Sequence, residues 1–339
     1  MKLLFITSTR IGDAVLSTAL LSHLINKYPQ ADITIACGPA AAPLFKETPG
    51  VNRIIAMQKR FMGGHWLALW LQVCFGYWNL VVDLRASALS YCLLVGRRMV
   101  WQTRTGMDHR LVSLAKFAGL KTLPAPRLWT SARHKAEAAR LLPDAPFIAL
   151  GPTANWPGKQ WSGKCFAELA KRLTAADGIL PGATILVFGA ASERISAAEA
   201  IDGLPPEQVV DLVGTIDLLT VAALLAHADL YIGNDSGLMH IAAAAGAPTL
   251  GLFGPSREAH YAPWGSHTAV VRTARDYDEL VGGPDYDHRT VGSLMGSLSV
   301  DMAEAGAREL WGRVLRKSRW TRFFLNFQSR CAFIMRPSN

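Results

Sequence analysis

The sequence predicts an α/β protein built from two doubly wound parallel sheets that face each other across a cleft. Short apolar runs alternate with helical patterns through the first 145 residues, a proline-containing break follows at 142–146, and the alternation then starts again. Alternating strands and helices form parallel sheets that are covered by helices on both faces. A chain of 339 residues is also long enough for two domains of about 150 residues each.

The first half contains the apolar runs that we expect to form one sheet, at 2–8, 31–37, 53–57, 79–84 and 98–103. The helical patterns between them lie at 14–27, 64–75 and 108–119. The most apolar stretch, 66–83, is interrupted by Gln72, Gly76 and Asn79 and ends in an aspartate. A buried helix followed by a buried strand therefore explains it better than a transmembrane span.

The second half repeats the alternation, with expected strands at 147–151, 184–189, 209–213, 229–233 and 249–254. Expected helices lie at 163–176, 217–227 and 237–246. We therefore place a first domain at 1–145, a second domain at 146–315 and a C-terminal tail at 316–339.

The composition is that of a globular protein, because 50% of the residues are hydrophobic and 18% are charged. The five cysteines form no CxxC pair, and no secretory signal is evident, so we expect a cytoplasmic protein without a zinc or disulfide framework. Residues 310–339 hold seven Arg or Lys and no acid, which leaves +2 of the net charge of +9 for the rest of the chain. The basic character therefore belongs to the tail, and nucleic-acid binding is not favoured.

Ligands of parallel sheets bind beyond the carboxyl ends of the strands. The loop after the first expected strand, TSTRIGD, places Arg10 and Asp13 there. Asp13 can cap the following helix, or it can be a reactive carboxylate at the mouth of the cleft. The residues of this loop alone leave both interpretations open.

The stretch GNDSGLMH places Asp235, Ser236 and Gly237 at the start of an alanine-rich helix. A helix N-terminus with small residues can bind a phosphate, although an ordinary capped helix start is an equal alternative. An acid repels phosphate, so Asp235 is expected to fix the loop or to accept a bond from a sugar hydroxyl.

Two further loops carry single charges. Lys159, in GPTANWPGKQW, can contact a diphosphate or remain a solvated lysine. Glu193, which follows the strand at 184–189, can hold ribose hydroxyls or cap a helix. No GxGxxG, Walker, GxSxG or HExxH motif is present, and the two aspartate pairs of 276–287 fit an exposed loop better than a metal site. We expect neither a cofactor nor a metal.

Three segments together resemble glycosyltransferase family 9, the bacterial heptosyltransferases: RIGDAVLSTALLSHL, PGKQWSGKCFAELAKRL and GNDSGLMHIAAAAGAPTLGLFGPS. The resemblance implies a GT-B fold with two Rossmann-like domains. It also implies an inverting, metal-independent transfer of a heptose from a nucleotide diphosphate, ADP-heptose by family precedent, to a lipopolysaccharide core acceptor. Alternatives are a GT-B transferase for another nucleotide sugar, a sugar-nucleotide epimerase and a non-catalytic sugar-nucleotide-binding protein.

The resemblance also implies roles for individual residues. Asp13 would be the general base, and the donor would be bound by Lys159, Glu193, Asp235, Ser236, Gly237 and His240. For an anionic glycolipid acceptor we nominate Arg10, Lys59 and Arg60, each of which can instead be a solvated surface charge.

The tail carries an aromatic stripe beside several arginines, formed by Trp320, Phe323, Phe324 and Phe327. Such a face suits an anionic membrane surface, and packing on the body is the equal alternative. The expected location is therefore the cytoplasm. The tail adds the expectation of peripheral contact with the cytoplasmic face of the inner membrane.

Overall fold

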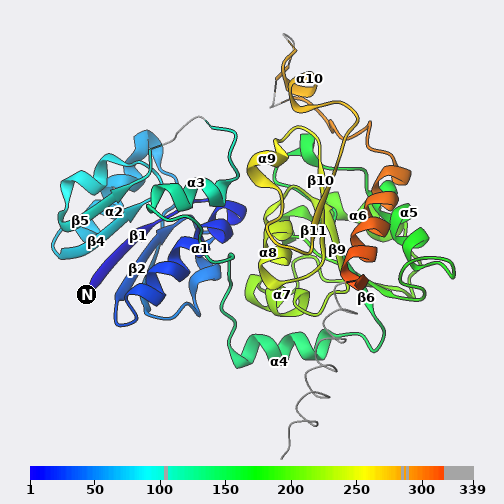
Figure 1. Cartoon of the computed structure of the whole chain (residues 1–339), viewed down its shortest axis with the longest axis horizontal. Helices are drawn as coiled ribbons and strands as arrows, with labels where there is room; N and C mark the ends of the chain where they lie inside the picture. Colours follow the sequence, from blue (N-terminus) through cyan, green and yellow to red (C-terminus); the bar gives the residue numbers. More distant parts are fainter. Residues whose placement is uncertain (103–105, 284–285, 288–289, 317–339) are drawn as a thin grey trace, which may run out of the picture.

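The computed structural model describes residues 1–102, 106–283, 286–287 and 290–316, which form two α/β lobes, each around a parallel sheet (Figure 1). The first sheet has the order β3-β2-β1-β4-β5 and the second has the order β11-β10-β9-β6-β7-β8. The strands of the first sheet are β1 Lys2–Ile6, β2 Asp32–Cys37, β3 Val51–Ala56, β4 Tyr77–Asp83 and β5 Leu94–Val100. Those of the second are β6 Phe147–Gly151, β7 Thr184–Val187, β8 Val209–Asp211, β9 Leu230–Asn234, β10 Thr249–Phe253 and β11 Thr268–Arg272.

Helices cover both faces of each sheet (Figure 1). The first lobe has α1 Ile11–Lys27, α2 Gly64–Val73 and α3 Arg110–Phe117, and the connection to the second lobe carries α4 Ala132–Leu141. The second lobe has α5 Gly163–Thr174, α6 Arg194–Asp202, α7 Leu218–Leu225, α8 Gly237–Ala245, α9 Glu258–Tyr261 and α10 Tyr277–Val281. Residues 300–316 form a further helix, orange to red in Figure 1, which packs on the second lobe through Ala303, Ala307 and Leu310.

The side chains of β1 alternate between two apolar layers, as the strand period requires. Leu3 and Phe5 belong to the layer that contains α1, whereas Leu4 and Ile6 belong to the layer that contains α2. The layer on the α1 side continues into α7 and α8 of the second lobe. The two lobes therefore share buried apolar surface on one side of the first sheet, and α2 lies on the opposite side.

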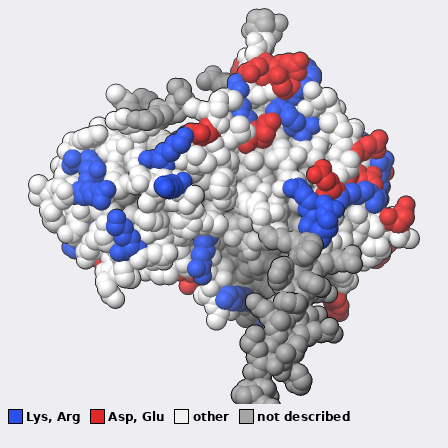
Figure 2. Space-filling model, in the orientation of Figure 1, with Lys and Arg blue, Asp and Glu red and all other residues white. Residues whose placement is uncertain are grey.

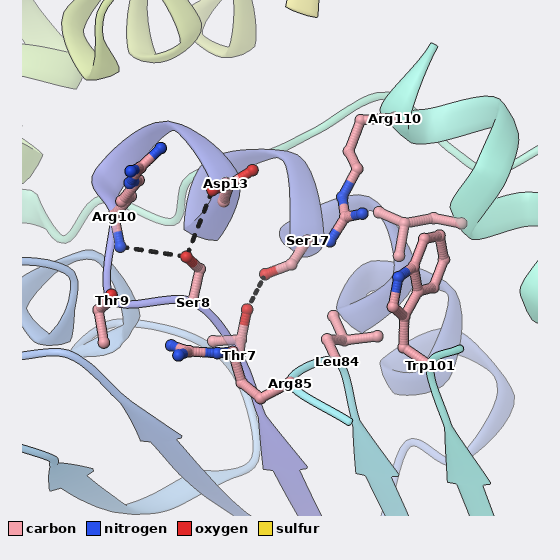
Figure 3. Close-up of a pocket in the computed structure, with 11 residues that line it drawn as sticks. Thr7, Ser8, Thr9, Arg10, Asp13, Ser17, Leu84, Arg85, Trp101 and Arg110 are labelled. Carbon is pink, nitrogen blue, oxygen red and sulfur yellow. Dashed lines mark hydrogen bonds between the residues drawn. The ribbon is translucent and has the colours of Figure 1, made fainter. Parts of the chain in front are cut away.

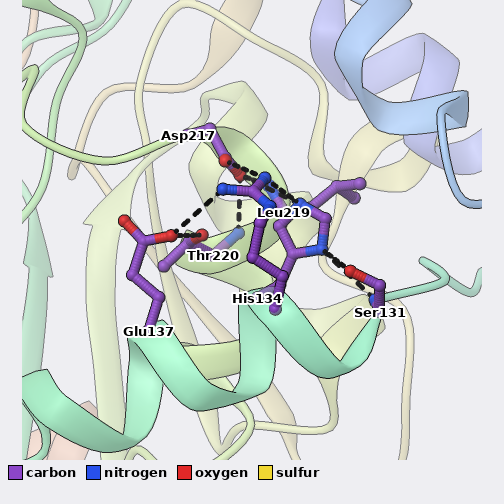
Figure 4. Close-up of polar contacts among 7 residues, drawn as sticks. Ser131, His134, Glu137, Asp217, Leu219 and Thr220 are labelled. Atoms are coloured by element: carbon purple, nitrogen blue, oxygen red, sulfur yellow. Dashed lines mark hydrogen bonds and ion pairs between the residues drawn. The ribbon is translucent and has the colours of Figure 1, made fainter.

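A polar network fixes α4 to α7 (Figure 4). Asp217 is the N-cap residue of α7, and its Oδ1 accepts hydrogen bonds from the backbone N–H groups of Leu219 and Thr220 at 3.0 and 2.9 Å. Its Oδ2 accepts a bond from the Arg133 guanidinium of α4 at 2.9 Å. The hydroxyl of Thr220 also donates to Glu137 of α4 at 3.1 Å. Although α4 precedes residue 145, it is therefore attached to the second lobe.

The expected strands and helices are present, and the apolar stretch 66–83 is a helix, α2, followed by a strand, β4. The expectation that this helix is buried is wrong, because only Leu69 and Val73 of its ten residues are buried. The strand β11, the helices α4, α6, α9 and α10 and the helix at 300–316 were not predicted. The expected division at 145–146 stays a prediction, and of the tail at 316–339 only residue 316 lies within the described residues. No helix of the described residues combines the length and the apolar character needed to cross a membrane.

Candidate active site

The N-terminal ends of α1 and α8 contact each other across the two lobes. A Cβ on Gly12 would lie 2.8 Å from Cδ2 of His240, and a Cβ on Gly237 would lie 2.7 Å from Cγ2 of Ile11. Real Cβ atoms do not approach other atoms so closely without a shift, so the glycines permit this contact. The first-strand loop motif and the GNDSG motif, more than 200 residues apart, therefore meet at one place.

A cavity of about 300 Å³ opens beside this contact at the carboxyl edge of the first sheet (Figure 3). The loop after β1 contributes four of its lining residues and α1 contributes Asp13 and Ser17. The loops after β4 and β5 and the helix α3 supply the rest. The complete lining is Thr7, Ser8, Thr9, Arg10, Asp13, Ser17, Leu84, Arg85, Trp101, Arg110 and Leu114.

Asp13 lies in the first turn of α1 and does not cap it. The N-cap residue is Arg10, which makes no side-chain cap bond. The Asp13 Oδ2 atom accepts a hydrogen bond from the Ser8 hydroxyl at 3.4 Å, and Ser8 Oγ in turn accepts one from the Arg10 backbone N–H at 3.1 Å (Figure 3). The capping interpretation of Asp13 is therefore wrong, and its carboxylate faces the cavity.

Two cationic side chains that the sequence analysis did not select also line the cavity. The Arg110 guanidinium lies over the Trp101 ring, 4.4 Å from its centroid. The turn that carries Arg85 is fixed by Asp83, whose Oδ1 accepts a bond from the Arg85 N–H at 2.8 Å and whose Oδ2 accepts one from the Ser87 hydroxyl at 2.5 Å. The position of Arg85, two residues after the end of β4, was an available signal, whereas Arg110 is the first residue of α3 and no strand end precedes it directly. With Arg10, they make this cavity suited to an anion.

On the second lobe, Lys159 and Asp235 form an ion pair with 2.5 Å between Nζ and Oδ2. Lys159 lies at the end of a short 3₁₀ turn, Pro157–Lys159, and Asp235 directly precedes the start of α8. The side chain of Asp235 is only 7% exposed and that of Lys159 is 22% exposed. The acid at the helix start is thus neutralised by the loop lysine and fixes the loop, which is one of the two roles expected for it.

The start of α8 contains buried polar atoms without a partner. Ser236 is the N-cap residue but makes no side-chain cap bond. Ser236 Oγ, the Tyr231 hydroxyl beside it and His240 Nδ1 are buried, and none of them makes a hydrogen bond of ordinary geometry among the described residues. Burial lowers the pKa of His240, and the charges of Asp235 and Asp13 oppose that shift in part. Because buried polar groups are normally paired, these atoms indicate a site that a polar ligand completes.

Glu193 caps a short 3₁₀ turn, Ala191–Glu193, rather than standing alone. Its Oε2 accepts hydrogen bonds from the Ala190 backbone N–H and the Thr153 hydroxyl, both at 2.9 Å. Glu193 is also the N-cap residue of α6, but its side chain makes no cap bond there, so the capping by Oε2 is confined to the short turn. These two bonds leave Oε1 available for a hydroxyl, so capping and ribose binding are compatible.

A second contact between the lobes lies beside the cavity. His109 accepts a bond from the Leu111 N–H at Nδ1, so its Nε2 carries the proton and donates to the carbonyl oxygen of Ala262 at 3.0 Å. Its ring also lies 4.7 Å from that of Trp264. Burial lowers the pKa of His109, the bond to Ala262 opposes this, and the nearby His260 adds to it. The neutral imidazole is the form that fits this contact.

The structure thus brings Asp13 and Arg10 to the cavity of the first lobe. The start of α8, which contacts α1, holds Asp235, Ser236, Gly237 and His240, and Lys159 pairs with Asp235 there. None of these second-lobe residues lines the cavity. Lys59 and Arg60 are exposed in the loop after β3 and do not line the cavity. Asp276 caps α10 and Asp278 pairs with Arg257 at 2.6 Å, so this aspartate pair has structural partners. Within the described ranges no group of three or more His, Cys, Asp or Glu side chains could hold a metal ion.

Known structures share this architecture. A family 9 glycosyltransferase from Veillonella parvula superposes with a TM-score of 0.75 and 17% identity, covering 91% of this chain and 97% of that one. The structure of E. coli ADP-heptose lps heptosyltransferase II gives a TM-score of 0.70 and 23% identity, covering 94% and 100%. The fold is therefore the GT-B arrangement.

Sequence comparison leads to the same group. Lipopolysaccharide heptosyltransferase 2 of Salmonella typhimurium is 28% identical over 325 residues, which cover 84% of this chain and 91% of that protein. The family model described as glycosyltransferase family 9 (heptosyltransferase) matches residues 87–281, more than half of the chain. The chain therefore belongs to glycosyltransferase family 9, and it is a glycosyltransferase.

Proposed function

We propose that this enzyme transfers a heptose from ADP-heptose to an anionic lipopolysaccharide core acceptor, with inversion and without a metal ion. Relatives of this chain are named lipopolysaccharide heptosyltransferases, and a structural neighbour was solved with ADP. The observation that carries the proposal is the contact of the α1 and α8 N-termini, because it brings a carboxylate close to a helix start that can bind an anion.

Asp13 acts as the general base. An alcohol is a weak nucleophile, so its proton must pass to a base while its oxygen attacks the anomeric carbon. The acceptor C–O bond forms as the bond from that carbon to the donor phosphate breaks, and the nucleoside diphosphate leaves with the electron pair. The proton ends on the Asp13 carboxylate. The bond from the Ser8 hydroxyl holds this carboxylate at the cavity wall.

The leaving diphosphate gains negative charge, and the second lobe supplies the groups that stabilise it. Lys159 provides a cationic hydrogen-bond donor whose charge Asp235 offsets in part, and the start of α8 provides backbone N–H groups and the Ser236 hydroxyl. Neutral His240 adds a ring nitrogen without a partner. Glu193 holds the ribose through the carboxylate oxygen that its capping bonds leave available.

The acceptor occupies the cavity of the first lobe. Arg10, Arg85 and Arg110 present three cations to it, which suits the carboxylates and phosphates of an anionic core glycolipid. Lys59 and Arg60, which are exposed in the loop after β3, then serve more distant parts of the acceptor. The aromatic stripe of the tail lies outside the described residues, and its proposed peripheral contact with the inner membrane is tested by flotation of a chain ending at Leu315.

The test is the substitution Asp13→Asn. We expect turnover to fall by about 10²–10⁴-fold, the usual contribution of a general base, while ADP affinity measured by calorimetry stays unchanged. Near-normal turnover would reject the base assignment. Thermal-shift screening of nucleotide sugars tests the donor, because stabilisation by a different nucleotide sugar but not by ADP-heptose would favour another GT-B transferase.

A further inference from the structure

The first lobe has an exposed apolar surface around α2. It is formed by Phe61, Met62, Leu67, Leu71 and Phe75, which we call the α2 face. Phe61, Met62 and Phe75 are each about nine-tenths exposed, and Leu67 and Leu71 are more than half exposed. Eight of the fourteen exposed large hydrophobic residues of the described chain lie between 61 and 94, so this exposure is concentrated and not scattered.

The α2 face belongs to a firmly held helix. Leu69 and Val73 are buried beneath α2, while Leu67 and Leu71, four residues apart, share the outward side. On one flank the Trp70 Nε1–H donates to the carbonyl oxygen of Cys92 at 3.1 Å. On the other flank Arg53 of β3 donates to the side chain and the carbonyl oxygen of Gln72, at 3.0 and 3.2 Å.

The second lobe does not cover this face. The helices α1 and α3 and the second lobe lie on one side of the first sheet, and α2 packs on the other side (Figure 1). The face is therefore apolar and is not covered by the second lobe.

The segment of the chain that carries the face is basic. Between residues 48 and 107 the sequence holds seven Arg or Lys and one acid, Asp83. Asp83 is fully buried and its carboxylate accepts bonds from the turn that follows it, so it adds no surface charge. The cations Lys59, Arg60, Arg97 and Arg98 are exposed. In the view of Figure 2 the first lobe likewise carries Lys and Arg with few Asp or Glu.

The face adjoins the cavity of the first lobe. Arg85 lines that cavity, and its guanidinium also lies over the ring of Trp66 in α2, 5.9 Å from its centroid. The loop with Phe61 and Met62 follows β3 and leaves the sheet at the same carboxyl edge as the cavity loops. A surface in contact with the α2 face would therefore lie next to the cavity.

We propose that the α2 face docks the enzyme on the surface of an anionic phospholipid bilayer. Its apolar side chains enter the boundary between headgroups and acyl chains, and the surrounding Lys and Arg side chains contact the lipid phosphates. The membrane then holds the cavity mouth beside the layer in which a lipid-anchored acceptor lies. This orienting consequence rests on the proposed function, whereas the binding itself does not.

Vesicle flotation of the full-length protein tests the proposal. The vesicles contain phosphatidylcholine alone or with phosphatidylglycerol, and neither acceptor nor nucleotide sugar is present, so the result is independent of the reaction. The test variant is Leu67→Ser, Leu71→Ser and Phe75→Ser combined. The control is Ile195→Ser, because Ile195 of α6 is as exposed as Phe75 (91% against 90%) but lies on the second lobe. Thermal unfolding checks that all variants are folded.

We expect the wild type and Ile195→Ser to float with the anionic vesicles, and added salt to weaken this. The triple variant should bind the anionic vesicles at least about tenfold more weakly than the wild type. Its turnover on a water-soluble acceptor fragment should be unchanged. The proposal is overturned if the triple variant floats like the wild type, since another part of the chain then binds the membrane. It is also overturned if the wild type binds no vesicle but forms a dimer that the triple variant loses, because a second copy then covers the face.

Discussion

The ion pair between Lys159 and Asp235 allows a prediction about donor binding. Lys159→Ala removes a cation, and it also leaves the Asp235 carboxylate, only 7% exposed, without its partner beside the start of α8. An uncompensated buried carboxylate repels a diphosphate. A hydrogen bond to a charged group contributes about 1.5–3 kcal/mol. We therefore expect loss of the contact between Lys159 and the diphosphate to weaken ADP binding by about 2 kcal/mol, or roughly thirtyfold.

Calorimetric titration of ADP into four proteins separates the two causes of this loss. Lys159→Ala should bind about thirtyfold more weakly than the wild type, and Lys159→Ala combined with Asp235→Asn should recover part of that loss, because the repelling charge is gone. The matched control is Lys164→Ala, since Lys164 is 83% exposed and its nearest acid, Glu199, is 4.0 Å away. If the double variant binds no better than Lys159→Ala, Asp235 does not repel the donor and our reasoning is refuted.

Three further predictions concern the contacts that build the site. Gly12→Ala should lower the melting temperature by about 2–4 °C, because the new methyl group meets buried His240, whereas Gly312→Ala, whose nearest neighbour is 3.6 Å away, should not; scanning calorimetry decides. Burial lowers the pKa of His240 below its unfolded value of about 6.5, so below that pH the unfolded chain binds more protons than the folded one and the free energy of unfolding falls. Urea unfolding of His240→Gln should therefore show a free energy of unfolding that depends less steeply on pH. Asp217→Ala should cost about 1–2 kcal/mol in the same assay, because α7 loses its N-cap and α4 its anchor, while Asp202→Ala should cost nothing measurable.

The fold could be predicted to the extent that it depends on local pattern. Central parallel strands are continuous apolar runs, so β1, β6 and β9 were evident from the sequence. The strand β11 was missed because it lies at the sheet edge and all of its residues are only half-buried. The helix α4 was missed because only two of its ten residues are buried, which leaves little apolar periodicity.

The site could be predicted only as separate loops. The rule that ligands bind at the carboxyl ends of strands selected Asp13, Lys159 and the GNDSG motif. It did not reveal that Lys159 pairs with Asp235, 76 positions away, or that His109 contacts the carbonyl oxygen of Ala262, 153 positions away. Such contacts depend on how the two lobes pack, and a single sequence carries no direct record of that packing.

The two helix N-termini that contact each other are not equivalent, and the difference supports the roles proposed for them. Each helix start carries a partial positive charge, so two starts in contact repel each other unless negative charge lies nearby. The helix α1 has Asp13 in its first turn, whereas α8 has no acid in its first turn and its neighbour Asp235 is already paired with Lys159. Asp13 therefore balances the partial positive charge at the start of α1, whereas the partial positive charge at the start of α8 remains available to a ligand. This asymmetry supports a base on the first lobe and a diphosphate site on the second, since the reverse arrangement would place the diphosphate against Asp13.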